Sequence, residues 1–183
     1  MILKEVKPLK QKKMMCGPAS LEIVLRYYGE DKNQIELKKM LGSNILTGTT
    51  NKKMIEISRN LGFKSQFKFN SSIGEIEKLI LKKIPPIIGW FTPEGTSHYS
   101  VVQGIDKNYI FIVDPELNKV RKIRIDEFSK RWLNVNWEEL SFLKKIFASI
   151  KIFLKNKINK KDNFNLPLNK NDIIFREIII IRK

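Results

Sequence analysis

Three residues of this sequence could together perform nucleophilic chemistry: Cys16, His98 and Asp114. Cys16 stands immediately before Gly17-Pro18 and a strong helical pattern, so its sulfur is expected at a helix N-terminus, where the macrodipole and free N–H groups favour an anion. The thiolate is the reactive form of cysteine, and such chemistry requires a site that lowers the thiol pKa. The alternative for a single cysteine is a small, buried and inert side chain.

His98 is the only histidine, and it begins a predicted strand after the polar turn 93–97. An imidazole can accept the thiol proton and later deliver it to a leaving amine. Asp114 ends the next strand, and a tight turn at 106–108 would bring the His98 and Asp114 ends of this hairpin together. A carboxylate there can orient the ring and stabilise the imidazolium. The alternatives are a surface or packed histidine and an ordinary strand-ending turn at Asp114-Pro115.

Gln11 lies five residues before Cys16. Its side-chain amide could donate a hydrogen bond to an oxyanion beside the backbone N–H of Cys16. The alternative is a solvated glutamine in a lysine-rich loop.

The elements that must position these residues change from helices to strands along the chain. Helical spacing of apolar residues, with caps and terminal glycines, predicts helices from Gly17 to Gly29, from Gln34 to Leu41, from about Thr50 to Leu61, and from an N-cap at Ser72 onward. Strands are predicted at Pro86–Phe91, His98–Ile105, Tyr109–Asp114 and Lys119–Ile125, followed by a short helix that Asp126 caps and that runs through Trp132, and by a last strand from near Ile173. Helices followed by an antiparallel sheet indicate an α+β fold.

The composition of the chain limits the classes of function, partner and cofactor that are expected. The 183 residues suit a single domain spanning 1–183, with 42% hydrophobic residues and a formal net charge of +16. Lysine is spread along the whole chain without a basic run interleaved with aromatic residues, so no nucleic-acid partner is expected. One cysteine and one histidine exclude a cysteine-based zinc cage and a multi-histidine metal site, so no cofactor is expected. The chain has neither a signal peptide nor an apolar run near the ~20 residues that span a bilayer, which predicts a cytoplasmic protein.

The segment 137–171 differs from the rest. Apolar residues recur there at helical spacing with lysines between them, which predicts a basic amphipathic helical insertion before the last strand. Its apolar face would either pack on the core or place the protein at the periphery of a membrane.

The motifs together resemble a known family. Gln11 ahead of Cys16-Gly17-Pro18-Ala19, the run from His98 to Asp106, and Val113-Asp114-Pro115 are similar in type and order to the C39 peptidases. These are papain-fold domains best known for removing leader peptides from bacteriocins at double-glycine sites. The resemblance covers about residues 9–135. It implies a papain-like fold in which an N-terminal helical half carries the cysteine, a C-terminal antiparallel sheet carries the histidine and aspartate, and the strand Ile178–Ile181 closes the sheet.

The resemblance also implies roles: Cys16 as nucleophile, His98 as general base and acid, Asp114 as orienting group and Gln11 as oxyanion donor. Two features depart from the family. The gap between glutamine and cysteine is one residue longer in many members, where Lys10 stands here, and segment 137–171 has no known family function. The chain also lacks the transmembrane and ATP-binding regions of exporter-fused members.

The expected function is therefore that of a cysteine peptidase that cleaves a peptide bond through a Cys16 acyl-enzyme, with leader-peptide processing as one activity. The alternative is a catalytically silent, C39-like module that binds a peptide and acts with a transporter or other partner. The implied partners are a peptide or protein substrate, an ABC-type exporter and a membrane surface.

Overall fold

The computed structural model describes residues 1–44, 48–135 and 173–183. In chain order its elements are α1 (Cys16–Tyr27), α2 (Gln34–Leu41), α3 (Asn51–Asn60), β1 (Lys64–Lys68), α4 (Ile73–Leu81), β2 (Ile87–Phe91), β3 (Ser97–Ile105), β4 (Tyr109–Asp114), β5 (Lys119–Arg124), α5 (Ile125–Arg131), β6 (Leu133–Val135), β7 (Ile173–Phe175) and β8 (Ile178–Arg182). The predicted insertion at 137–171 lies outside the described residues.

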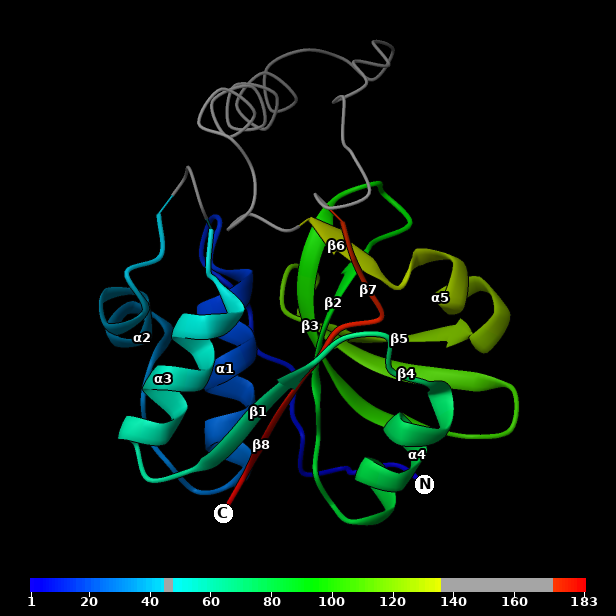
Figure 1. The fold of residues 1–183 in the computed structure, drawn as a ribbon, viewed down its shortest axis with the longest axis horizontal. Helices are drawn as coiled ribbons and strands as arrows, with labels where there is room; N and C mark the ends of the chain where they lie inside the picture. The colour runs from blue at the N-terminus through cyan, green and yellow to red at the C-terminus, as the bar shows by residue number, and fades with distance from the viewer. Residues whose placement is uncertain (45–47, 136–172) are drawn as a thin grey trace, which may run out of the picture.

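The helices α1, α2 and α3 form one side of the molecule, and a curved sheet forms the other (Figure 1). The sheet has the strand order β1-β8-β2-β3-β4-β5, and every neighbouring pair is antiparallel. β8 comes last in the sequence but lies between β1 and β2, so the C-terminal strand closes the sheet as expected. The α+β order of the elements is confirmed.

Local sequence signals explain where the helices begin. Asn33 and Ser72 cap α2 and α4, each in a capping box with the glutamate three residues on. α1 instead begins at Cys16 without a side-chain cap. Its Leu21 and Leu25 are fully buried in the core, and the helix packs on β3. The N-terminus of α1 is therefore held by tertiary packing, while its first N–H groups are free of a capping side chain.

Two details of the predicted elements were wrong. Asp126 does not cap α5, because the helix begins one residue earlier, at Ile125, and the Asp126 carboxylate accepts from Arg124 Nε at 3.0 Å. The predicted final strand is two strands separated at Arg176, whose φ of 48° is in the left-handed region. As a result β7 pairs with β6 in a separate two-stranded ribbon, while β8 joins the main sheet.

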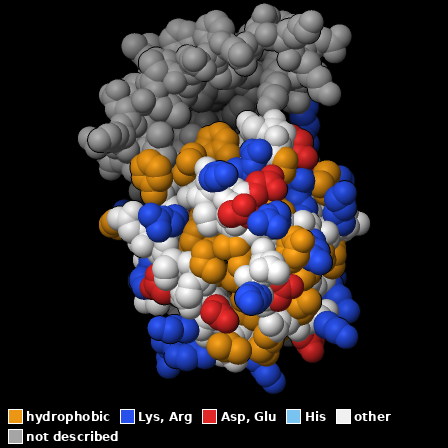
Figure 2. Space-filling view, turned by 90° about the vertical axis from the view of Figure 1, so that its right-hand side faces the viewer, with side chains coloured by type: hydrophobic (Ala, Val, Ile, Leu, Met, Phe, Trp, Pro, Cys, Tyr) orange, Lys and Arg blue, Asp and Glu red, His pale blue; other side chains and the backbone are white. Residues whose placement is uncertain are grey.

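On the face that lies to the right in Figure 1, the positive charge is distributed and does not form a single patch. There Lys and Arg side chains alternate with acidic and apolar ones (Figure 2). Within the parts of the chain that the structure describes, no helix is long and apolar enough to cross a bilayer.

Candidate active site

Cys16 is the first residue of α1, one residue before the predicted start of the helix at Gly17, and its side chain is half-buried. Its neighbour Gly17 lies so close to the loop before α3 that a Cβ added there would stand 2.5 Å from Thr49 Oγ1. Only glycine permits this approach, since real Cβ contacts are essentially never below 3 Å. Gly17 therefore allows the N-terminus of α1 to pack against Thr49. This contact fixes the position of the Cys16 thiol.

The thiol of Cys16 is paired with the imidazole of His98. Burial raises the pKa of the thiol, but the hydrogen bond to His98, the charge of that ring, and the backbone N–H groups of Tyr99 and Gly17 outweigh burial. The pKa of Cys16 consequently lies below its ordinary value, as a nucleophilic cysteine requires. The helix N-terminus and the imidazole from β3 both favour the thiolate.

His98 lies between the thiol and a buried carboxylate. Its Nε2 is 3.1 Å from Asp114 Oδ1, and both side chains are almost completely buried. Burial lowers the pKa of His98, but the hydrogen bonds to Asp114 and Cys16 raise it to about 10 overall. Because Nε2 faces Asp114, the other ring nitrogen, Nδ1, is the one available to the thiol. The three predicted residues are thus brought together in the order Cys16, His98, Asp114.

Arg121 is a site residue that the sequence analysis missed. Its Nε donates to Asp114 Oδ2 at 2.6 Å, and its two terminal nitrogens donate to the Glu94 carboxylate at 3.1 and 2.9 Å. Burial raises the pKa of Asp114, but His98 and then Arg121 hold it well below its usual range. Arg121 is one of several basic residues on β5, so only its register opposite Ile112 on β4 could have distinguished it.

Gln11 lies beside the Asp114 end of the site. Its backbone N–H donates to the carbonyl of Pro115 at 2.8 Å, and its side-chain Oε1 is buried without a hydrogen-bond partner among the described residues. Gln34 holds the residues on either side, accepting from the Lys12 N–H at 2.6 Å and donating to the Lys10 carbonyl at 3.0 Å. The Lys10 ammonium donates to the carbonyl of Glu116. The loop that carries Gln11 is thus held in place. The role of the Gln11 side chain as an oxyanion donor stays a prediction.

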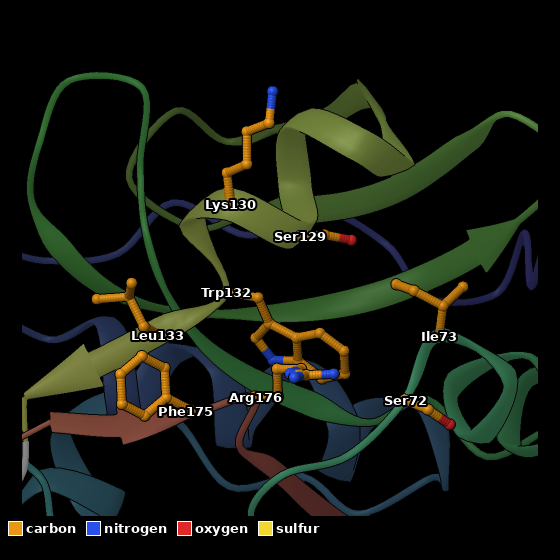
Figure 3. A pocket seen from close by; sticks show the side chains of 8 residues that line it. All are labelled: Ser72, Ile73, Ser129, Lys130, Trp132, Leu133, Phe175 and Arg176. Atoms are coloured by element: carbon orange, nitrogen blue, oxygen red, sulfur yellow. The ribbon is translucent and has the colours of Figure 1, made fainter.

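A pocket of about 410 Å³ lies between α4, α5 and β7, and the Trp132 side chain forms part of its lining (Figure 3). Its lining residues are Ser72, Ile73, Ser129, Lys130, Trp132, Leu133, Phe175 and Arg176. None of these is a predicted site residue. In the described part of the chain no cluster of three or more His, Cys, Asp or Glu side chains could hold a metal ion.

Residues 6–137 match the model of the Peptidase C39 family. The chain belongs to the C39 peptidase family. The match spans the segments that carry Gln11, Cys16, His98 and Asp114, and it ends before β7 and β8. Both strands therefore lie beyond the segment that the family model covers.

Among curated C39 relatives, the lactococcin transport/processing ATP-binding protein LcnC-like of Lactococcus lactis subsp. lactis strain IL1403 is 30% identical over 125 residues, which are 67% of this chain. The transport/processing ATP-binding protein ComA of Streptococcus pneumoniae strain R6 is also 30% identical over 125 residues. The aligned part is 17% of the length of each relative, so the comparison concerns one part of these longer proteins.

Solved C39 structures share the fold. The peptidase domain of Streptococcus ComA, a bifunctional ABC transporter involved in quorum sensing, superposes with a TM-score of 0.60 at 26% identity, covering 69% of this chain and 92% of that chain. A double-glycine-motif protease from an AMS/PCAT transporter, solved with its leader peptide, gives a TM-score of 0.57 at 23% identity and covers 69% and 84%. The predicted papain-like fold and family are confirmed.

Proposed function

We propose that this chain is a cysteine peptidase in which Cys16, His98 and Asp114 form the catalytic triad. The observation that carries the proposal is the position of His98, which bonds the Asp114 carboxylate at 3.1 Å on one side and the Cys16 thiol on the other. The lowered pKa of Cys16 and the raised pKa of His98 favour a thiolate–imidazolium pair. A site that only bound peptides would have no use for such a pair.

The geometry supports two chemical stages. The Cys16 thiolate attacks the carbonyl carbon of the scissile bond, the C–N bond breaks, and the His98 imidazolium gives its proton to the departing amine. Water then attacks the Cys16 thioester while His98 accepts a proton from that water, and this releases the acid and regenerates the thiolate. Asp114 stabilises the imidazolium in both stages, and Arg121 keeps Asp114 ionised.

The Gln11 amide is assigned to the oxyanion. The backbone bond to Pro115 and the two bonds from Gln34 to its neighbours hold its loop beside Asp114. The Gln11 Oε1 is buried and accepts no hydrogen bond within the described residues, and the NH₂ group of the same amide is the donor that an oxyanion would use. The fixed backbone limits where the Gln11 amide can lie, and removing one oxyanion donor costs about 100- to 1000-fold in rate in other hydrolases.

The relatives favour a leader peptide as the substrate and its proteolytic processing as the activity. The transport/processing proteins of Lactococcus and Streptococcus carry the aligned region, and the double-glycine protease was solved with a leader peptide. By this likeness the chain would act on an exported peptide beside an ABC-type exporter, at the cytoplasmic side of the membrane. The alternative, a silent module that binds the leader and presents it to the exporter, shares this partner.

A cleavage assay separates the two functions. The protein is incubated with synthetic peptides that carry a double-glycine site, and the products are identified by mass spectrometry beside the Cys16→Ala variant. Cleavage after the glycines that disappears in the variant supports the peptidase. Binding without cleavage by either protein would establish the silent module instead.

A further inference from the structure

Both chain neighbours of His98 are tied to the same buried carboxylate. Ser97 and Tyr99 flank His98 on β3, and each is linked through an asparagine to one oxygen of Glu177. Glu177 lies between β7 and β8, far from His98 in the sequence, and the proposed chemistry does not use it. The two links therefore join the segment between β7 and β8 to the strand that carries the imidazole.

The first link runs through the helical side of the molecule. The Tyr99 hydroxyl donates to Asn51 Oδ1 at 2.8 Å, and Asn51 Nδ2 donates to Glu177 Oε2 at 3.0 Å. Asn51 is the first residue of α3. The backbone N–H of Tyr99 also helps to lower the pKa of Cys16, so this link holds a residue that itself contacts the thiol.

The second link runs through the small ribbon. The Ser97 hydroxyl donates to Asn134 Oδ1, and Asn134 Nδ2 donates to Glu177 Oε1. Asn134 lies on β6 and is 2% exposed. The backbone of Glu177 is held as well, because Trp132 Nε1 donates to its carbonyl at 3.0 Å.

The absence of a side chain at Gly89 leaves room for the Glu177 carboxylate. Glu177 is fully buried, and Gly89 on β2 faces it. A Cβ at Gly89 would stand 1.5 Å from Glu177 Oε1 and 2.3 Å from Asn134 Nδ2. Any larger residue at position 89 would displace the carboxylate, so glycine is required for this close approach.

The donors around Glu177 suit the ionised carboxylate better than the protonated acid. Each asparagine uses its oxygen to accept from Tyr99 or Ser97, so each presents an NH₂ donor to Glu177. A carboxylate accepts from both amides, whereas the protonated acid carries an O–H group that needs an acceptor of its own. Burial raises the pKa of Glu177, the uncharged amides of Asn134 and Asn51 lower it by less, and the resulting pKa is about 7.

We propose that Glu177 is a positioning residue, which sets the place of His98 and of the Tyr99 N–H against Cys16 through Asn51 and Asn134. The inference rests on the proposed function, because Glu177 is proposed to position the thiolate–imidazolium pair of Cys16 and His98. Glu177→Gln keeps the shape but presents an NH₂ group to at least one of the two facing donors. The pair then loses its fixed geometry while its own residues remain unchanged.

The test is the rate at which iodoacetamide alkylates Cys16 between pH 5 and 10, followed by intact mass. The reading is unambiguous because Cys16 is the single cysteine. Glu177→Gln is expected to move the acidic limb of the pH profile upward by about one unit, which slows alkylation about ten-fold at pH values below the thiol pKa. Tyr99→Phe and Ser97→Ala each remove one hydroxyl link and are expected to shift the same limb by less. Glu56→Gln, an exposed carboxylate on α3 paired with Lys53, is the matched control and should behave as wild type.

The outcomes separate the inference from the function on which it rests. A reactive wild-type thiol with unchanged profiles in Glu177→Gln, Tyr99→Phe and Ser97→Ala would overturn the positioning role alone. If Glu177→Gln does not fold, as judged by far-UV circular dichroism, the two hydroxyl variants decide. A wild-type thiol no more reactive than that of an unstructured peptide would overturn the proposed function and the inference together.

Discussion

Arg121 donates its Nε–H to Asp114 Oδ2 at 2.6 Å, while His98 occupies the opposite oxygen, Oδ1, at 3.1 Å. The Asp114 carboxylate is therefore held from both sides. Backbone N–H groups of Glu116 and Leu117 donate to Oδ1 at 2.8 and 3.3 Å and complete its shell. Such a shell keeps the carboxylate ionised in a fully buried position, where an unpaired charge would be strongly unfavourable.

Arg121→Met tests this relationship. Removing one partner of a buried ion pair leaves an uncompensated charge, and the expected loss in the free energy of unfolding at pH 7 is about 3 kcal/mol. Denaturant unfolding measures it, with Arg124→Met as control, since Arg124 lies on the same strand and its ion pair with Asp126 is exposed. Equal losses in the two variants would show that Asp114 does not depend on Arg121.

The paired titration of Cys16 and His98 predicts a pH window for acylation. The thiolate forms as pH rises through the lowered pKa of Cys16, and the proton for the leaving amine is lost as pH rises through the His98 pKa of about 10. Single-turnover cleavage should therefore fall above about pH 10. Asp114→Asn removes the charge that raises the His98 pKa, so the alkaline limb should move to lower pH. An unmoved alkaline limb would assign it to another group.

Gly17→Ala is expected to disturb the site without touching its reactive atoms. The added Cβ would meet Thr49 Oγ1 at 2.5 Å and Thr49 Cβ at 2.6 Å, so the start of α1 must move and Cys16 alkylation should slow. Gly74→Ala in α4 is the matched control, because its nearest neighbour would be Ser72 Oγ at 3.9 Å. That variant should gain about 0.5 kcal/mol in helix stability. Equal alkylation rates in both variants would contradict the positioning of the thiol by this contact.

Glu177 predicts a pH-dependent stability of specified sign. Its pKa rises from 4.5 in the unfolded chain to about 7 on folding, so between these values the native state holds more protons. The free energy of unfolding then falls as pH rises from 4.5 to 7, by an amount on the order of 3 kcal/mol. Urea denaturation across this range should show the slope in wild type and its loss in Glu177→Gln. An identical slope in both proteins would place the titration elsewhere.

The sequence was sufficient for the features that depend on local pattern. The helix that follows Cys16, the Ser72 capping box and the hairpin joining His98 to Asp114 follow from periodicity, caps and a turn. β1 was missed because its exposed and half-buried residues alternate without an apolar face. Arg121, Asn51 and Asn134 could not be recognised, since polar residues acquire these roles only when the register places them against a buried partner. Glu177 stands beside an isoleucine run with nothing in its local pattern to show that it is buried.

The most direct test of the account is to trap the acyl-enzyme. The wild-type protein is mixed with a peptide ester that carries the cleaved sequence, quenched in acid after milliseconds to seconds, and analysed by intact mass and peptide mapping. The account predicts a transient mass gain equal to the acyl fragment on the peptide that contains Cys16, absent in Cys16→Ala and strongly diminished in His98→Ala. Hydrolysis that persists in a folded Cys16→Ala variant would contradict it.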